Sequence, residues 1–477
     1  MAAAKKAASG PRRLAAKKAK RSAPTPAGAG SRKQAAPRQK PASGASSAQP
    51  SPSATGATGM RVRMYRVGFG DFFLLTVRTG RGPKPERHIL IDCGVHAQDL
   101  GSIKAAVAQM AEDCGKELAL VIMTHRHADH ISGFGTCSDV FSQISVDRVW
   151  MPWFENPIND TAVKFQANLT ALAAQLSMRL AARADQFAAM ADNITGGLAA
   201  AGGSGNQKAL DVLNKGFRNT PVHDYYKAGD QANLPQDLVD AGFSAQILGP
   251  PGDPRLITQL TNTNDQFLAE SAQEDSEQAR TFPPAFRLAS YPPHAFKFYS
   301  PDKVKALVAG VQPDVLAARA QAADKTLNNQ SLVILFGFAG KHLLFAGDAQ
   351  WGNWENFLYG GAFGTPGHTE MTPQAKEILG KIDFYKVGHH GSRNATPKDA
   401  VAAMRLGCVG MCSTQIHAYN EVPREPLLQA LNGRMQGQLA RSDQVAVAGE
   451  PANPDAGPVP TGSGFESPGT LFIDYNF

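Results

Sequence analysis

Short apolar and alternating runs open the part of the chain that follows residue 59. RVRMYRV, DFFLLTV and HILIDCG lie between Met60 and Leu100, with the turn-rich GRGPKPE between the last two, and predict an opening β-meander. Ser102 to Cys114 is expected to be a helix, and Leu118 to Met123 a buried strand. Further strands are expected in VDRVWMPW, FSAQILG, NNQSLVILF, KHLLFAGDAQ, GCVGMCST and TLFIDYNF. Because helices fall between these strands, the pattern predicts an α/β fold.

Three segments interrupt this pattern. Leu169, Leu172, Leu176 and Leu180 recur at helical spacing in an Ala-rich background, which predicts a helical insertion over about 160–220. Its expected role is packing over the domain, with a lid or a dimer interface as alternatives. Irregular insertions are expected at about 255–325, which includes an acidic stretch around Glu270 to Glu277, and at about 446–468, which is rich in Gly and Pro.

The first 59 residues differ in composition from the rest. They consist almost wholly of Ala, Gly, Ser, Pro, Lys and Arg, so they cannot bury a core and are expected to be disordered. This arm carries twelve basic and no acidic side chains. Since the whole chain has 48 basic and 41 acidic side chains, the remainder has 36 against 41 and is net acidic. The arm is therefore expected to bind nucleic acid, or else to be a solubilising or targeting tail.

The other compositional features favour a cytoplasmic protein. No stretch approaches eighteen continuous apolar residues, so no membrane helix is expected. The five cysteines are odd in number and lack CxxC spacing, which favours reduced thiols. Residues 60–477 are expected to form one large domain, because the chemically distinctive residues described next are spread over most of this range.

THRHADHISG, Thr124 to Gly133, carries the densest candidate chemistry. It follows the predicted strand that ends at Met123 and places His125, His127, Asp129 and His130 within six positions. Three imidazoles and a carboxylate on a turn from strand to helix can converge on one point, and this donor set suits zinc or a similar divalent metal. The alternative is a polar loop that happens to contain histidines.

The spacing HxHxDH resembles the signature of the metallo-β-lactamase superfamily, and further motifs follow the family's order. Asp92 lies in HILIDCG, Asp348 in KHLLFAGDAQ, and His389 and His390 in DFYKVGHHGSRNAT. VGFGDFFLL, NNQSLVILF, HHGS and, faintly, the RSD triplet at 441–443 are similar to the ComEC-type branch, the hydrolase domain of DNA-uptake proteins. The resemblance covers about residues 60 to 445 and implies an αββα sandwich.

For the site, the resemblance implies two divalent ions, with Zn²⁺ expected and Mn²⁺ as an alternative. One ion would be bound by His125 and His127 and the other by Asp129, His130 and His390, with Asp348 bridging the two. Such a pair can share a hydroxide nucleophile and hold the oxygens of an in-line displacement. Asp92 would orient the ligand loop through hydrogen bonds.

The remaining candidates are expected to act on the substrate. Asp129 and His389 are the catalytic candidates, and His389 would contact the substrate or protonate the leaving group. Lys386 and Ser392 are candidates for phosphate contact. Trp153 and Trp351 would form an aromatic wall, with packing against the inserted helices as the alternative.

The chain departs from the family in two respects. No clear motif supplies the third histidine of the first ion, for which His223 and His294 are the available candidates, so a weakly held first ion is expected. ComEC-type proteins also carry a membrane channel, whereas no membrane helix is expected here, so transport is not implied.

A phosphodiesterase or nuclease is the first functional hypothesis. The second is a hydrolase of a small molecule such as a cyclic nucleotide, phosphoester or lactone, because the acidic body offers no cationic track. The third is a binding protein with a degenerate site.

Overall fold

The computed structural model describes residues 58–80, 82–96, 103–167, 205–262, 265–267, 326–415, 422–447, 451–461 and 464–477. The described residues from Thr58 onward belong to one compact unit. The first strand already begins at Gly59, one residue before the expected boundary, and pairs with the end of the second strand. The leucine-spaced part of the expected helical insertion and most of the segment 255–325 lie outside the described residues.

Eight of the described strands form one mixed sheet, in the order β13-β14-β1-β2-β3-β4-β5-β6. The expected meander is confirmed, because β1 pairs antiparallel with β2, and β2 with β3. From β3 to β6 the pairing is parallel. The strands are β1 Gly59–Tyr65, β2 Phe72–Arg78, β3 Glu86–Cys93, β4 Glu117–Ile122, β5 Ser145–Pro152, β6 Val222–Tyr226, β13 Phe465–Glu466 and β14 Phe472–Asn476.

The other six described strands form a second mixed sheet, in the order β12-β11-β10-β9-β8-β7. The pairing is antiparallel from β7 to β9 and parallel from β9 to β12. The strands are β7 Ser244–Gly249, β8 Val333–Phe338, β9 Lys341–Phe345, β10 Phe384–Lys386, β11 Val409–Cys412 and β12 Leu439–Arg441.

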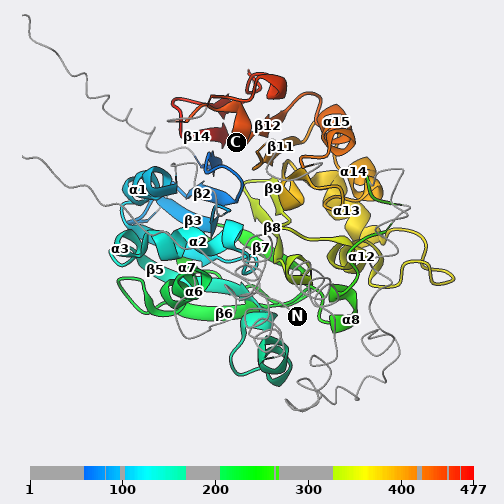
Figure 1. The fold of residues 1–477 in the computed structure, drawn as a ribbon, viewed down its shortest axis with the longest axis horizontal. Helices are drawn as coiled ribbons and strands as arrows, with labels where there is room; N and C mark the ends of the chain where they lie inside the picture. Colours follow the sequence, from blue (N-terminus) through cyan, green and yellow to red (C-terminus); the bar gives the residue numbers. More distant parts are fainter. Residues whose placement is uncertain are drawn as a thin grey trace, which may run out of the picture. The chain divides into compact units, whose positions relative to one another are not determined.

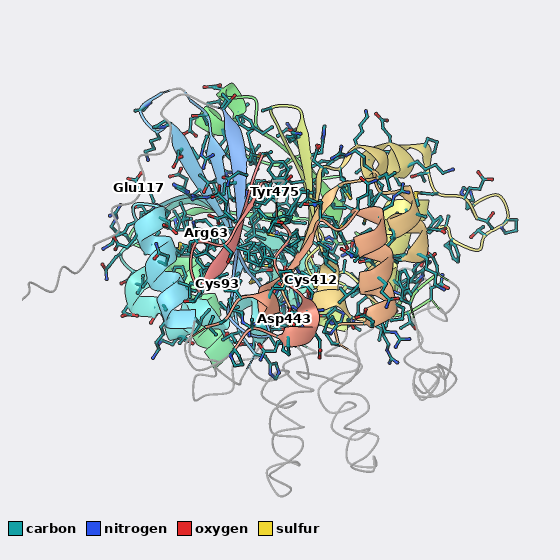
Figure 2. The ribbon with its side chains drawn as sticks, turned by 90° about the horizontal axis from the view of Figure 1, so that it is seen from above. Arg63, Cys93, Glu117, Cys412, Asp443 and Tyr475 are labelled. Carbon is teal, nitrogen blue, oxygen red and sulfur yellow. The ribbon has the colours of Figure 1, made fainter. Side chains whose placement is uncertain are left out.

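Alternation along the strands places one hydrophobic cluster between the two sheets. Phe73 and Leu75 of β2 share this cluster with Ile334 and Phe336 of β8, while the intervening residues face the opposite side of each sheet. Cys93 and Cys412, labelled in Figure 2, belong to the two different outer clusters. All five cysteines are buried, and none of them forms a disulfide bond.

Helices cover the outer face of each sheet (Figure 1). Those of the first sheet are α1 Ile103–Asp113, α2 Ala128–Thr136, α3 Ser138–Phe141 and α6 Gly205–Lys215. Those of the second are α12 Trp351–Tyr359, α13 Pro373–Lys381, α14 Lys398–Ala403 and α15 Glu425–Arg434. In α1 the buried residues Ile103, Ala106, Val107, Met110 and Ala111 follow helical spacing, which explains how this helix packs. The described elements are therefore layered as helices, sheet, sheet and helices.

Shorter elements complete the described chain: α7 Gln236–Asp240, α8 Pro254–Ile257, η1 Trp153–Glu155, η4 Gly388–Gly391, η5 Ser442–Gln444 and η6 Pro454–Ala456. The segment 446–468 is not wholly irregular as expected, because Phe465 and Glu466 form β13 beside the C-terminal strand β14. β6 was not predicted, although it extends the parallel part of the first sheet. No helix among the described residues is both long and apolar enough to span a membrane.

Candidate metal centre

The site lies where strands of both sheets end. Asp92 is near the end of β3. The ligand loop, Thr124 to His130, leads from β4 into the first turn of α2, which carries Asp129 and His130. Asp348 follows β9, and His390 follows β10 in η4. Because β3 and β4 run parallel, as do β9 and β10, the carboxyl ends of each pair lie at one sheet edge. Residues that are far apart in the sequence meet there.

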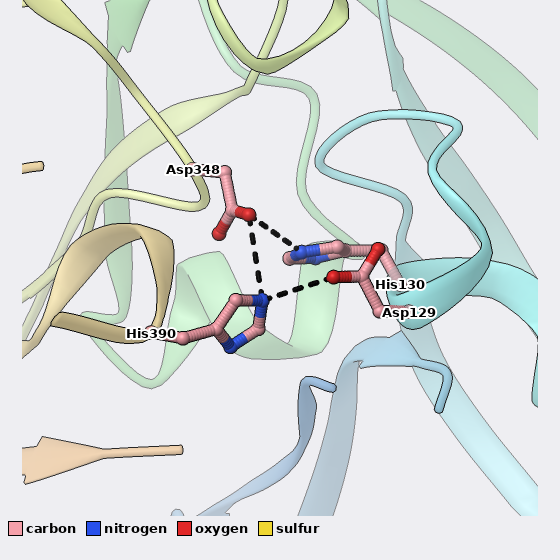
Figure 3. A group of neighbouring side chains, drawn as sticks. All are labelled: Asp129, His130, Asp348 and His390. Carbon is pink, nitrogen blue, oxygen red and sulfur yellow. Dashed lines mark hydrogen bonds and ion pairs between the residues drawn. The ribbon is translucent and has the colours of Figure 1, made fainter. Parts of the chain in front are cut away.

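Four side chains form a group with the spacing of metal ligands. Asp129, His130, Asp348 and His390 each offer one ligand atom, and these atoms all lie within 4.8 Å of one another. His130 Nε2 lies 3.1 Å from Asp348 Oδ2, and His390 Nε2 lies 3.1 Å from Asp129 Oδ2 and 3.5 Å from Asp348 Oδ2. Figure 3 shows the four side chains pointing toward one another.

These separations fit a bound divalent ion. With metal bonds of about 2.0 to 2.1 Å, two ligand atoms on a tetrahedral ion are about 3.3 to 3.4 Å apart. The three measured separations lie around this value. His130 Nε2 and Asp348 Oδ1 are buried and form no hydrogen bond. Their charged neighbours are Asp348 Oδ2 at 3.1 Å and Lys386 Nζ at 3.7 Å, so both atoms can still bind an ion. The residues therefore fit a divalent metal ion.

Hydrogen bonds orient both histidines toward this point. His130 Nδ1 lies 2.8 Å from Asp92 Oδ2, and His390 Nδ1 lies 2.9 Å from the carbonyl oxygen of Ser413. Each acceptor places the proton on Nδ1, which leaves the Nε2 lone pair free for a ligand. Asp92 also accepts hydrogen bonds from Thr124 N at 2.8 Å and Thr124 Oγ1 at 2.6 Å, so it fixes the start of the ligand loop.

Burial and charge act in opposite directions on these groups. Burial disfavours the charged form of both histidines and is the largest single influence, but Asp348 and the other neighbouring carboxylates together outweigh it and raise the pKa of both His130 and His390. Burial likewise opposes the charge on Asp129 and Asp348, yet the neighbouring imidazoles hold the pKa of both carboxyls below the usual range. For Asp92, burial dominates and raises the pKa. The centre therefore concentrates carboxylate charge where a cation would bind.

Gly70 and Gly94 allow their own backbone segments to lie close to Asp129 and His130. A Cβ on Gly94 would lie 2.4 Å from the backbone of Asp129 and His130, and one on Gly70 would lie 2.8 Å from the carbonyl oxygen of Asp129. Real Cβ atoms essentially never come this close, so only glycine fits at either position.

The backbone is also strained around the site. Asp92, His389 and His390 have φ values of 54°, 46° and 51°, in the left-handed region. This conformation costs a non-glycine residue roughly 1 to 2 kcal/mol. The surrounding contacts must supply that energy, as they do at many functional sites.

His125 and His127 form a pair at the edge of the ligand group. His125 Nε2 lies 3.0 Å from His127 Nδ1. Within the described residues, no third His, Cys, Asp or Glu completes a group of ligands with them. His223, a candidate for this role, lies in β6 with Nε2 3.1 Å from the carbonyl oxygen of Leu213, and His294 is outside the described residues. For the first of the two expected ions, the described residues therefore supply two histidines, and Asp348 does not join them in a ligand group.

His390 rather than His389 enters the ligand group. His389 Nδ1 lies 3.1 Å from Asn394 Oδ1, and its Nε2 lies 3.2 Å from Asn328 Nδ2. These contacts fit a neutral ring that donates from Nδ1 and accepts at Nε2. Burial lowers the pKa of His389 to about 4, so the ring carries no extra proton at neutral pH. The expected role as proton donor to a leaving group does not fit this state, whereas substrate contact does.

The expected substrate contacts are all largely buried. Lys386 is 2% exposed and forms an ion pair with Asp71, so its ammonium is engaged with the protein rather than with a phosphate. Ser392 is 8% exposed and donates to Asn394 Oδ1 at 3.1 Å. Trp351 packs with Tyr359 and Phe363 in the cluster outside the second sheet.

Trp153 is buried with Phe154 and donates from Nε1 to the carbonyl oxygen of Pro251 at 3.2 Å. The described contacts thus place Trp153 and Trp351 in the packing role, which was the alternative to an aromatic wall. Their partners are neighbouring loops and helices.

Some residues of the centre were not identified as site residues from the sequence. Asp71, Ser331 and Ser413 contribute contacts to the ligands, and Arg126 donates from Nε to Glu155 Oε1 at 2.8 Å and so ties the ligand loop to η1. Asp71 had a signal, the GD pair in VGFGDFFLL. The carbonyl oxygen of Ser413 had none, because any residue type has one.

Comparisons with known proteins add no identification. No protein-family model matches this chain, and neither does any curated protein sequence.

Proposed function

We propose that this protein is a metal-dependent hydrolase of the metallo-β-lactamase type that cleaves phosphodiester bonds. The observation that carries the proposal is the convergence of Asp129, His130, Asp348 and His390, from three separate segments, with the spacing of metal ligands. The layering of helices, sheet, sheet and helices supports the family assignment, as does the order of the motifs along the chain.

In this proposal Asp129, His130, Asp348 and His390 would hold one divalent ion. A second ion at His125 and His127 would be weaker, because Asp348 does not join these two histidines in a ligand group. Zn²⁺ suits two imidazoles and two carboxylates, and Mn²⁺ is the alternative. When bound, such an ion supplies Lewis acidity and lowers the pKa of water, which is the chemistry that phosphodiester hydrolysis needs.

Other groups of the chain orient the histidines of the site. Asp92 and the carbonyl oxygen of Ser413 keep a proton on Nδ1 of His130 and His390. Asp129, one of the catalytic candidates, has its Oδ2 3.1 Å from His390 Nε2, so both atoms face the proposed ion. His389, held between Asn328 and Asn394, would accept a hydrogen bond from the substrate in place of the one from Asn328.

The metal site is tested by elemental analysis of purified wild type and Asp348→Ala. We expect up to about two metal ions per wild-type chain. The variant should lose metal and hydrolysis while keeping its circular dichroism spectrum. Asp224→Ala is a matched control. Asp224 lies in β6, is buried, forms an ion pair with Arg148 of β5 and does not belong to the ligand group. An unchanged metal content in Asp348→Ala would refute the assignment of Asp348.

The substrate class is tested by assaying single-stranded DNA, bis(p-nitrophenyl) phosphate and a lactone, each with and without chelator. Chelator-sensitive cleavage of the phosphodiesters is the expected result. Cleavage of the lactone alone would favour a small-molecule hydrolase, which the net acidic composition beyond the arm also favours. A metal-loaded protein that cleaves none of the three would favour a binding protein.

A further inference from the structure

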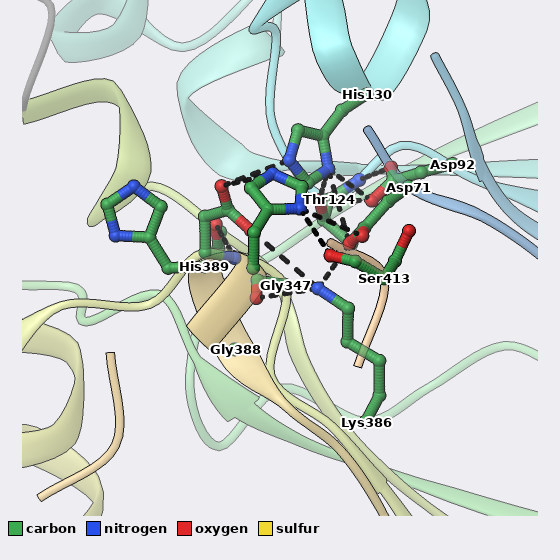
Figure 4. A network of polar contacts seen from close by, with 12 residues as sticks. Asp71, Asp92, Thr124, His130, Gly347, Lys386, Gly388, His389 and Ser413 are labelled. Carbon is green, nitrogen blue, oxygen red and sulfur yellow. Dashed lines mark hydrogen bonds and ion pairs between the residues drawn. The ribbon is translucent and has the colours of Figure 1, made fainter. Parts of the chain in front are cut away.

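A buried ion pair lies behind the candidate ligands. Lys386 is the last residue of β10, and Asp71 directly precedes β2; they are 2% and 1% exposed. The Lys386 ammonium contacts Asp71 Oδ2, donates to the carbonyl oxygen of Gly347 at 3.2 Å and lies 3.7 Å from Asp348 Oδ1 (Figure 4).

Asp71 reaches the three remaining ligands. Its backbone N–H donates to the carbonyl oxygen of Asp129 at 2.8 Å. Its Oδ1 lies 3.5 Å from His390 Nδ1, and its Oδ2 lies 3.7 Å from His130 Nδ1. The pair of Asp71 and Lys386 thus lies against each residue of the four-ligand group, on the side away from the ligand atoms of the two histidines.

The same pair also affects a second group of possible metal ligands. Asp71, Asp92 and His130 also have atoms within 4.8 Å of one another, close enough to hold an ion. The Lys386 ammonium already contacts Asp71 in this group, and a metal ion placed there would be repelled by it at short range. The ammonium is farther from the four-ligand group, at 3.7 Å from Asp348 Oδ1, so a cation is favoured there over the second group.

We propose that Asp71 and Lys386 are positioning residues, which fix the four ligands and exclude a cation from the group behind them. This proposal rests on the metal site proposed above. A pair that served only the stability of the core would not need contacts to every ligand. It would also leave metal affinity unchanged once both of its charges were removed.

The test is the double variant Asp71→Asn/Lys386→Met in the full chain. Either single change leaves a buried charge without its partner and is expected to destabilise the protein, whereas the double change removes both charges at nearly constant size. We would measure thermal unfolding of the chelator-treated protein, and Zn²⁺ affinity by competition with a chromophoric chelator. The double variant should unfold close to wild type and bind Zn²⁺ about ten- to a hundredfold more weakly.

Arg63→Met/Asp474→Asn is the matched control. Arg63 and Asp474 form a buried ion pair with two contacts of 2.7 Å between β1 and β14, and neither residue belongs to a ligand group. This control should leave Zn²⁺ affinity unchanged. If the first double variant does not fold, Asp71→Glu keeps the charges and lengthens one side chain, and its Zn²⁺ affinity is judged by the same criterion.

The outcomes separate the two proposals. Wild-type affinity in the folded Asp71 and Lys386 variant would overturn the positioning role alone. Failure of the wild-type chain to bind Zn²⁺ or Mn²⁺ would overturn the metal site and the positioning role together.

Discussion

Gly94→Ala tests the close approach between the end of β3 and the ligand loop. The added Cβ would lie 2.4 Å from the backbone of Asp129 and His130, and ordinary contact begins at 3.4 Å, so the loop has to move by about 1 Å. Metal sites tolerate errors of only about 0.2 Å in their bond lengths. Two of the four ligands therefore move by several times the tolerated error.

We expect Zn²⁺ affinity to fall at least tenfold, a loss of about 1.4 kcal/mol or more of binding free energy. The metal-free protein should lose about 1 to 3 kcal/mol of stability, as is usual when a packed position is enlarged. Competition with a chromophoric chelator measures the first quantity, and urea unfolding in the presence of chelator measures the second.

Gly380→Ala is the control. Gly380 lies on an exposed position of α13, where a Cβ would meet nothing within 4 Å. The substitution should stabilise the helix by about 0.5 to 1 kcal/mol and leave Zn²⁺ affinity unchanged. Wild-type Zn²⁺ affinity in Gly94→Ala would show that the contact between Gly94 and the loop does not position the ligands.

Three further changes have defined outcomes. Asp92→Asn should weaken Zn²⁺ binding about ten- to a hundredfold, because an amide can accept on only one of the two atoms that now serve Thr124 and His130; equal affinity by chelator competition would contradict this. Burial lowers the pKa of His88 from 6.5 to about 4. As pH falls from 6.5 to 4, the unfolded chain therefore binds a proton at His88 before the folded protein does, and the free energy of unfolding decreases by about 3 kcal/mol. Urea unfolding should therefore show His88→Gln gaining about that much relative to wild type between pH 6.5 and 4, and a constant difference would refute it. Removing Met1–Ser53 should flatten the salt dependence of DNA binding without changing turnover of a small phosphodiester; superimposable salt titrations would remove the arm from this role.

The ligand loop and its strand could be predicted because their signals are local. Leu118 to Met123 is a continuous apolar run and coincides with β4 to within one residue, and the four polar ligand candidates follow it directly. The order of the motifs also allowed Asp92 and Asp348 to be placed beside this loop, although they are distant in sequence.

The burial of Lys386 and Trp351 could not be predicted in the same way. Lys386 ends a strand and precedes HHGS, and this position in the sequence is equally compatible with a substrate contact and with a buried ion pair. The contact with Asp71 shows that Lys386 is in a buried ion pair. This contact forms only because the two sheets pack together, which the sequence pattern does not show. Trp351 is likewise buried by Tyr359 and Phe363. β6 escaped detection because VHDYY has neither a clear alternation nor a continuous apolar run.

The position of the four ligands on two sheets has a mechanical consequence. Asp129 and His130 follow a strand of the first sheet, whereas Asp348 and His390 follow strands of the second. An ion held by all four would be a cross-link that closes a very long loop of the chain, in the manner of a disulfide between distant residues. Because an ion that binds only the folded state stabilises it by mass action, chelation should loosen the attachment of one sheet to the other as well as empty the site.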